Sequence, residues 1–213
     1  MLVCWSIGGG GGTSVVAAGL AAVADRADDP VLLVDLGGDQ PTLHDVPEPE
    51  GPGLAEWLRA PSDVPVAALR HLEVELADGT ALLPRGGGAL RPDRAHTLAD
   101  GLLADDRAVV VDAGMPRHGS VAAALVDADR SFLIVRACPV SLRRLERTAA
   151  VPTGIVVVRD RRRSVTWREV AAAGRAPVVA ELEVDPAVAA AVDAGLCRRS
   201  LPRRFLRALE GLG

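Results

Sequence analysis

Hydrophobic residues along the chain fall into short continuous runs that alternate with longer alanine-rich runs. The short runs are rich in Val, Leu and Ile and lack an alternation of polar and apolar positions, which is typical of parallel strands covered on both faces. The predicted strands are Leu2–Ser6, Val31–Leu36, Thr80–Leu83, Ala108–Asp112, Ser131–Arg136, Gly154–Val158 and Pro177–Ala180. The pattern therefore favours a sheet of mostly parallel strands.

The alanine-rich runs between these strands have the length and composition of helices. The predicted helices are Thr13–Ala27, Leu54–Arg59, Asp93–Ala104, Ser120–Val126, Ser141–Ala149, Ser164–Ala173, Pro186–Ala194 and Pro202–Leu209. Regular strand–helix alternation indicates a Rossmann-like, doubly wound α/β fold, in which helices flank a mostly parallel sheet. Two segments interrupt the alternation and are predicted as loops, Gly37–Gly53 and Pro84–Pro92. Ligands sit at the carboxyl ends of strands in such folds, so both loops are candidates for a binding site, with a solvated connector as the alternative.

Length and charge narrow the class of protein. A chain of 213 residues suits one domain, and we treat residues 1–213 as a single α/β domain. The formal net charge of −4 opposes a nucleic-acid footprint over the whole surface, although a local basic patch stays open. No apolar stretch is long enough to span a membrane, and no basic leader precedes the first strand, so we expect a cytoplasmic protein.

A glycine run between the first strand and the first helix is the main chemical signal. The run and the hydroxyl pair after it are Gly8, Gly9, Gly10, Gly11, Gly12, Thr13 and Ser14. Glycines let backbone N–H groups turn toward an anion, and the start of a helix adds positive potential, so this order of elements suits a phosphate-binding loop. A tight turn, or a loop that no longer binds anything, is the alternative. A valine at Gly11 is expected to abolish any binding, because it would crowd the phosphate and resist a positive φ.

The loop lacks the charge that ATP hydrolysis needs. An ATPase loop carries a lysine beside the hydroxyl pair to neutralise the β- and γ-phosphates. Gly12 takes that place, and the sequence contains no lysine at all. Two acids, Asp35 and Asp112, lie at the carboxyl ends of predicted strands. Carboxylates at strand ends beside a phosphate loop hold Mg²⁺ or its waters, so Thr13, Asp35 and Asp112 are candidate magnesium ligands.

In this combination the segments resemble the MinD/ParA group of deviant P-loop ATPases over nearly the whole chain, most of all its CpaE/TadZ-like and septum-site branch. The family's loop, Lys-Gly-Gly-x-Gly-Lys-Thr-Ser/Thr, aligns with residues 7–14, which read Ile-Gly-Gly-Gly-Gly-Gly-Thr-Ser. Residues 34–36, Val-Asp-Leu, are similar to the family's second motif, and residues 110–114, Val-Val-Asp-Ala-Gly, to its Walker B motif. The resemblance implies a P-loop NTPase fold and a nucleotide site made of residues 8–14 with Asp35 and Asp112.

The chain departs from the family pattern at positions that carry charge or recognition. Ile7 replaces the signature lysine that reaches across a nucleotide-sandwich dimer, and Gly12 replaces the P-loop lysine. Gly37 stands where many members carry the Asp that orients the attacking water, and the adenine-reading Asn falls near Arg159 and Asp160. Loss of one group that stabilises transition-state charge can cost ~10²–10³ in rate, so we expect no useful ATP hydrolysis and name no catalytic residue.

Three hypotheses for the function follow from this resemblance. The first is a non-enzymatic spatial organiser or scaffold for pilus or secretion assembly or septum placement, which acts through protein partners and homodimerisation. The second is an ATPase that binds ATP or ADP with Mg²⁺ weakly, uses backbone N–H groups and arginines in place of lysine, and switches between monomer and dimer. The third is a DNA-associated partition factor that uses the basic run 159–163. The alternative interpretation of this run is a solvated surface loop.

The C-terminal segment 198–212 interleaves leucines and Phe205 with arginines. This basic amphipathic pattern is the only candidate for direct membrane binding. The family resemblance favours instead a terminal helix that packs on the body of the protein. The histidines and cysteines lack ligand spacing, so no site for a metal such as zinc is predicted; His118 is the histidine nearest to the predicted nucleotide site.

Overall fold

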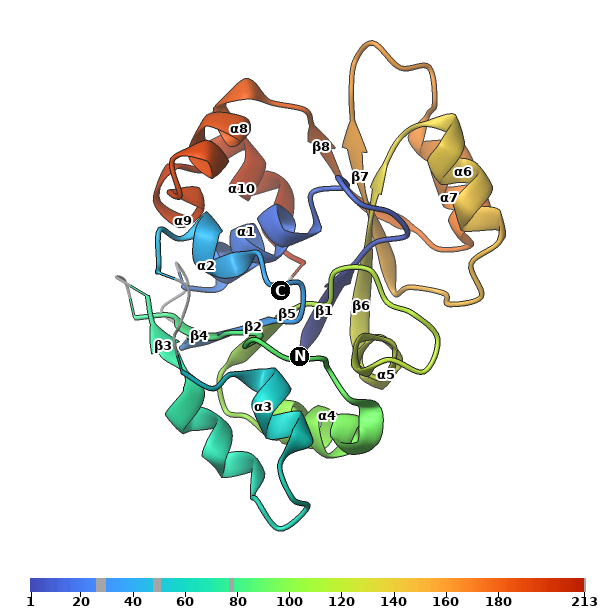
Figure 1. The fold of residues 1–213 in the computed structure, drawn as a ribbon. Coiled ribbons are helices and arrows are strands. Elements are labelled where there is room, and N and C mark those ends of the chain that lie inside the picture. The colour runs from blue at the N-terminus through green and yellow to red at the C-terminus, as the bar shows by residue number, and fades with distance from the viewer. Residues whose placement is uncertain (26–29, 48–50, 77–78, 213) are drawn as a thin grey trace.

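An eight-stranded sheet in the order β3-β4-β2-β5-β1-β6-β7-β8 forms the centre of the computed structural model, which describes residues 1–25, 30–47, 51–76 and 79–212 (Figure 1). The strands are β1 Leu2–Trp5, β2 Val31–Asp35, β3 Val74–Glu75, β4 Ala81–Leu83, β5 Ala108–Asp112, β6 Arg130–Arg136, β7 Gly154–Arg159 and β8 Val178–Glu183. Neighbouring strands pair in parallel, except that the short β3 pairs antiparallel with β4 at one edge. The predicted mostly parallel α/β fold is confirmed.

Helices cover both faces of this sheet (Figure 1). The α-helices are α1 Thr13–Asp25, α2 Gln40–Leu43, α3 Leu54–Arg59, α4 Ala95–Leu103, α5 Val121–Ala128, α6 Pro139–Glu146, α7 Trp167–Gly174, α8 Pro186–Asp193, α9 Cys197–Ser200 and α10 Arg203–Leu209. Two 3₁₀ helices are η1 Val66–Leu72 and η2 Pro92–Arg94. The core on one face includes side chains of α3 to α7, and the core on the other includes side chains of α1, α2, α9 and α10.

The burial of the strands explains their sequence pattern. In β1, Val3 and Trp5 belong to one core and Leu2 and Cys4 to the other, so every position of this central strand is apolar. The edge strand β8 instead alternates buried and exposed positions after Val179. Because of this alternation, the end of β8 does not form a continuous apolar run. The strand extends to Glu183, beyond the predicted end at Ala180.

Several boundaries differ from the prediction. The predicted loop 37–53 contains α2, which has a proline in its first turn, and residues 48–50 of that loop lie outside the described residues. Residues 26–27 of the predicted first helix also lie outside them. Neither η1 nor β3 was predicted, because η1 buries only Leu69 and β3 is two residues long. Helix α6 starts at Pro139 rather than at Ser141. Proline is favoured in the first turn of a helix, where its missing N–H costs nothing.

The C-terminal helix α10 packs against α1. Phe205, Leu206 and Leu209 are buried, and a Cβ at Gly19 of α1 would lie 2.8 Å from both Leu209 Cδ1 and Phe205 Cε1. The glycine therefore lets the two helices approach closely. The amphipathic pattern of this segment is used for packing within the protein. In the described ranges no helix combines the length and apolar character needed to cross a membrane.

Candidate functional site

The glycine run forms the turn from β1 into α1 at the carboxyl edge of the sheet (Figure 1). Gly10 and Gly12 have φ of +73° and +88°, a backbone region that L side chains rarely adopt. Gly11 is buried and its φ is not positive, so the expectation that a valine there would resist a positive φ is wrong. A Cβ at Gly11 would lie 3.5 Å from Ile134 O, which is an ordinary van der Waals distance, and the expected crowding of a bound phosphate stays a prediction.

The start of α1 offers free backbone donors to the space beside the loop. The first helical hydrogen bond runs from Val16 N to Gly12 O at 2.9 Å. Within residues 1–25, 30–47, 51–76 and 79–212, no protein acceptor bonds the N–H groups of residues 13–15. Unfilled donors at a helix N-terminus favour an anion, so the loop keeps the form of a phosphate cradle.

Asp35 and Asp112 face each other at the ends of β2 and β5, and both are fully buried. A Cβ at Gly37 would lie 3.5 Å from Asp35 Oδ1 and from Asp112 Oδ2, so the two carboxyl groups converge on this glycine. Asp35 accepts hydrogen bonds from Gly38 N at 2.7 Å and Gln40 N at 3.1 Å. Burial, reinforced by the charge of Asp112, raises the pKa of Asp35 to about 7, and burial also raises the pKa of Asp112. A bound cation would relieve this concentration of negative charge.

Gln40 is a site residue that the sequence prediction missed. Its fully buried side chain donates from Nε2 to Asp112 Oδ2 at 2.8 Å and to Ser14 O at 3.0 Å. Ser14 Oγ in turn donates to Asp39 Oδ2 at 3.2 Å. The segment after β2 is thereby tied both to the phosphate loop and to the second acid. Gln40 is the sole glutamine of the chain and follows a strand-ending acid, which is the only signal that could have found it.

The oxygen atoms at this edge fit a magnesium ion in their chemistry. Mg²⁺ is usually held by one or two carboxylates together with waters and substrate phosphates. Asp35 and Asp112 supply two carboxylates, Thr13 supplies a hydroxyl, and Gln40 Oε1 is buried without a hydrogen-bond partner in the described part of the chain. That part holds no group of three or more His, Cys, Asp or Glu side chains suited to a metal ion. A magnesium ion would therefore need the phosphates of a nucleotide as further ligands.

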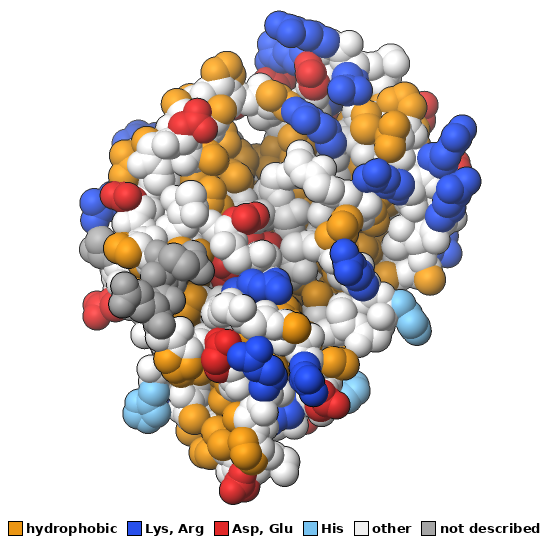
Figure 2. All heavy atoms as spheres, in the orientation of Figure 1, with side chains coloured by type: hydrophobic (Ala, Val, Ile, Leu, Met, Phe, Trp, Pro, Cys, Tyr) orange, Lys and Arg blue, Asp and Glu red, His pale blue; other side chains and the backbone are white. Residues whose placement is uncertain are grey.

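Arginines approach the loop from its flanks. Arg85, after β4, donates from Nη1 to Leu36 O at 2.6 Å. Arg144 of α6 lies against Gly8, because its Nη1 fills the space that a Cβ at Gly8 would need. Sequence reasoning named the loop 84–92, which contains Arg85, as a candidate for the binding site, but it missed Arg144, which comes from an element far along the chain. Figure 2 shows basic side chains over α6 and over the loop after β7; in that loop Arg161 pairs with Glu183 at 2.8 Å.

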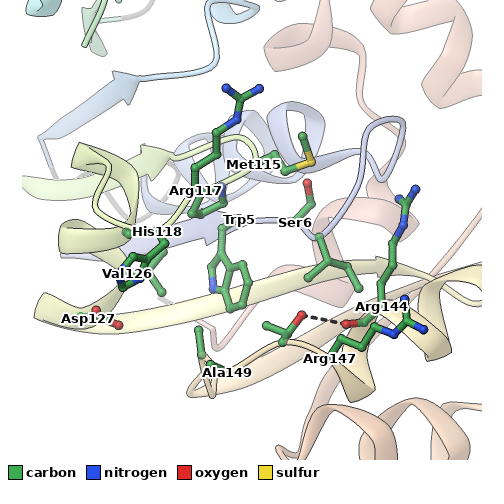
Figure 3. Close-up of a pocket in the computed structure, with 15 residues that line it drawn as sticks. Trp5, Ser6, Met115, Arg117, His118, Val126, Asp127, Arg144, Arg147 and Ala149 are labelled. Carbon is green, nitrogen blue, oxygen red and sulfur yellow. Dashed lines mark hydrogen bonds between the residues drawn. The ribbon is translucent and has the colours of Figure 1, made fainter. Parts of the chain in front are cut away.

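A cavity of about 710 Å³ opens beside the loop, on the face of the sheet opposite α1 (Figure 3). Its lining includes Trp5, Ser6 and Ile7 at the end of β1, and Arg117 and His118 after β5. None of residues 8–14, Asp35 or Asp112 lines it. His118, predicted to lie nearest to the nucleotide site, is thus placed in a separate cavity.

Comparison with known proteins gives a fold. No protein-family model matches the sequence, and no curated protein matches it. A ParA family ATPase from Chlorobium tepidum matches with a TM-score of 0.76 at 18% identity, over 98% of this chain and 94% of that one. The septum site-determining protein MinD from Pyrococcus horikoshii, complexed with Mg-ADP, matches at 0.75 and 16%, over 98% and 93%. A substituted form of McdA from Cyanothece, in complex with ATP, matches at 0.74 and 18%, over 97% and 92%. The chain therefore has the fold of the MinD/ParA P-loop ATPases.

Proposed function

We propose that this protein is a degenerate relative of the MinD/ParA ATPases that acts as a spatial organiser or scaffold, with little or no ATP hydrolysis. The observation that carries the proposal is the backbone at Gly12, whose φ of +88° is unsuited to an L side chain. The P-loop lysine is absent from position 12, and the backbone conformation at this position would also strain a lysine placed there. The likeness of the fold to ParA, MinD and McdA supports a positioning role carried out through protein contacts.

The charges around the loop support the same proposal. Arg85 is hydrogen-bonded to a backbone carbonyl, and Arg144 lies at Gly8, at the opposite end of the loop from Thr13. Gly37 adds no carboxylate to orient water beside the buried acid pair. The loss of one charge-stabilising group can cost ~10²–10³ in rate, and both family lysines are absent here. Binding and assembly are then the remaining roles of this fold.

The process is proposed from the family resemblance alone. Pilus or secretion assembly and septum placement are the candidates, as in the CpaE/TadZ-like branch, and we propose that residues 1–213 act as one domain in the cytoplasm. A homodimer and protein partners fit such a role. A DNA-associated partition factor has less support, because Arg161 of the basic run is paired with Glu183.

A weak nucleotide-dependent switch is the second candidate. It is favoured by the free N–H groups of residues 13–15 and by the acid pair with Gln40 Oε1. In this case residues 8–14 would bind the phosphates of ATP or ADP, while Thr13, Asp35 and Asp112 would hold the magnesium ion. The ion would supply charge neutralisation at those phosphates.

Phosphate release from ATP separates the two candidates. With Mg²⁺ present, the purified protein should release phosphate at the rate of buffer, and the Asp112→Ala variant should behave identically. Turnover above buffer that disappears in Asp112→Ala would reject the scaffold without hydrolysis and favour the switch. A nucleotide titration of the same samples then gives the affinity, which we expect to be too weak for nucleotide to survive purification.

A further inference from the structure

We propose that the cavity beside Trp5 is a binding site for a small organic anion with an apolar body, such as a carboxylate or phosphate ester on an aromatic skeleton. None of residues 8–14 lines the cavity, so the proposed ligand is distinct from a nucleotide bound in the phosphate loop. The size, the charge and one buried donor of the cavity each support it.

The size and the walls suit an apolar body. Ligand sites commonly enclose about 300–1,000 Å³ and are lined mainly by apolar side chains with a few polar groups. The volume here is about 710 Å³. The apolar walls are formed by Trp5, Ile7, Met115, Pro116, Ala123 and Val126. Met115 at this wall is 51% exposed and leaves apolar surface for a ligand to cover.

The charge of the lining favours an anion. Arg117, Arg144 and Arg147 line the cavity and are exposed, and none of them forms an ion pair within the described ranges. Among the residues that the structure describes, Asp127 is the only acid in the lining. Figure 3 shows Arg117 on one side of the cavity and Arg144 and Arg147 across from it. Guanidinium groups recognise carboxylates and phosphates through paired N–H donors, so a ligand between them would gain charge-assisted hydrogen bonds.

A buried donor points to an acceptor on the ligand. Trp5 is 3% exposed, and its Nε1 has no acceptor in the described part of the chain. Trp57 is equally buried, yet its Nε1 donates to Pro65 O at 3.2 Å. A buried N–H group without an acceptor is energetically unfavourable, and a phenylalanine at this position would avoid that cost. Figure 3 shows the indole between His118, Val126 and Asp127 on one side and Arg144 and Arg147 on the other. A ligand that displaces the exposed His118 and Asp127 side chains would reach the donor.

The test follows the indole N–H signals of the full chain by ¹⁵N NMR, with 1-naphthoate and 1-naphthyl phosphate as probes. The chain has three tryptophans, and Trp→Phe variants assign their signals. We expect a saturable downfield shift of the Trp5 signal with either anion, because a bound oxygen accepts from Nε1, and no shift of the Trp57 signal, whose N–H is already bonded. Probe fluorescence gives the affinity.

Neighbouring arginines in α6 and at its C-terminal end provide a matched control. Arg144→Gln and Arg147→Gln should each weaken binding about tenfold, the value of one charge-assisted hydrogen bond. Arg143→Gln, on the same helix and exposed but outside the cavity, should leave the affinity unchanged. The neutral 1-naphthalenemethanol should bind at least about tenfold more weakly than the anions for the same reason.

Three results would overturn the proposal. One is a Trp5 signal that does not move at millimolar probe concentrations, and another is equal affinity for the anions and the neutral alcohol. The third is a Trp5 signal that responds only to an acidic, leucine-containing peptide, which would assign the cavity to a protein partner. The arginine variants keep the test decisive even if Trp5→Phe fails to fold.

Discussion

At the scale of single residues, Gly9 and Gly12 differ in one respect that decides whether a lysine is tolerated. A Cβ at either position would meet nothing within 4 Å, but only Gly12 has a positive φ. We expect Gly12→Lys to lower the free energy of unfolding by about 1–2 kcal/mol relative to Gly9→Lys, which adds the same charge without backbone strain. Urea denaturation of both variants measures the difference. Equal stability, together with tight Mg·ATP binding by Gly12→Lys, would mean that the loop readily returns to an ATPase conformation.

The residues of the site divide into those that a local pattern reveals and those that only the fold brings in. Asp35 and Asp112 could be predicted because each directly ends an apolar strand. The contact of Arg144 with Gly8 could not, because it depends on how α6 packs beside β1. Gln40 of α2 donates a hydrogen bond to Asp112 at the end of β5, and no spacing in the sequence specifies that contact.

At the scale of elements, Asp185 joins α8 to α10. It caps α8 by accepting from Ala187 N at 2.9 Å and also accepts from Arg204 Nε of α10 at 2.8 Å. The hydrogen bond from Arg204, helped by the Ala187 N–H, lowers the pKa of Asp185 in the folded state. The folded pKa lies below the unfolded value of about 3.9, so this stabilisation is complete above that pH and is lost as the pH falls through the folded pKa.

The substitution Asp185→Asn separates the charge from the cap, because Asn caps helices as well as Asp does. We expect it to cost up to about 1 kcal/mol at pH 7, the range for a partly exposed ion pair, and progressively less below about pH 4. Urea denaturation across this pH range measures the loss, with Asp193→Asn at the other end of α8 as the control. A loss of the same size at pH 3 and pH 7 would exclude the ion pair as its source.

Elements could be predicted where burial on both faces, or a long apolar period, leaves a strong pattern. The central strands and α1 meet that condition. Short elements such as β3 and α2 do not, because β3 is two residues that pair with β4 and α2 is four residues, too few to repeat an apolar period. The cavity depends on the separation of α5 from α6, which is a property of packing that a sequence pattern does not carry.

At the scale of the whole molecule, the carboxyl edge of the sheet brings the phosphate loop and the Trp5 cavity together on opposite faces. Arg144 touches both, since it lies against Gly8 and lines the cavity. Ile7, the residue in place of the signature lysine, is half-buried on the core and also lines the cavity. A half-buried aliphatic side chain offers no cation to a nucleotide in a second subunit, so we expect that this position does not couple assembly to ATP.

We therefore expect the oligomeric state to be independent of nucleotide. Sedimentation velocity of the purified chain should give the same distribution with and without Mg·ATP, because neither Ile7 nor Gly12 provides a cation to bridge two subunits through phosphates. Exposed apolar side chains near the cavity, such as Met115 at 51% and Val151 at 56%, are the candidates for contacts between copies. Asp112→Ala, which removes a candidate magnesium ligand, should leave the distribution unchanged as well. The opposite result would be a monomer that becomes a dimer only when ATP is added and that stays monomeric in Asp112→Ala. That result would contradict the scaffold hypothesis and favour the nucleotide-dependent switch.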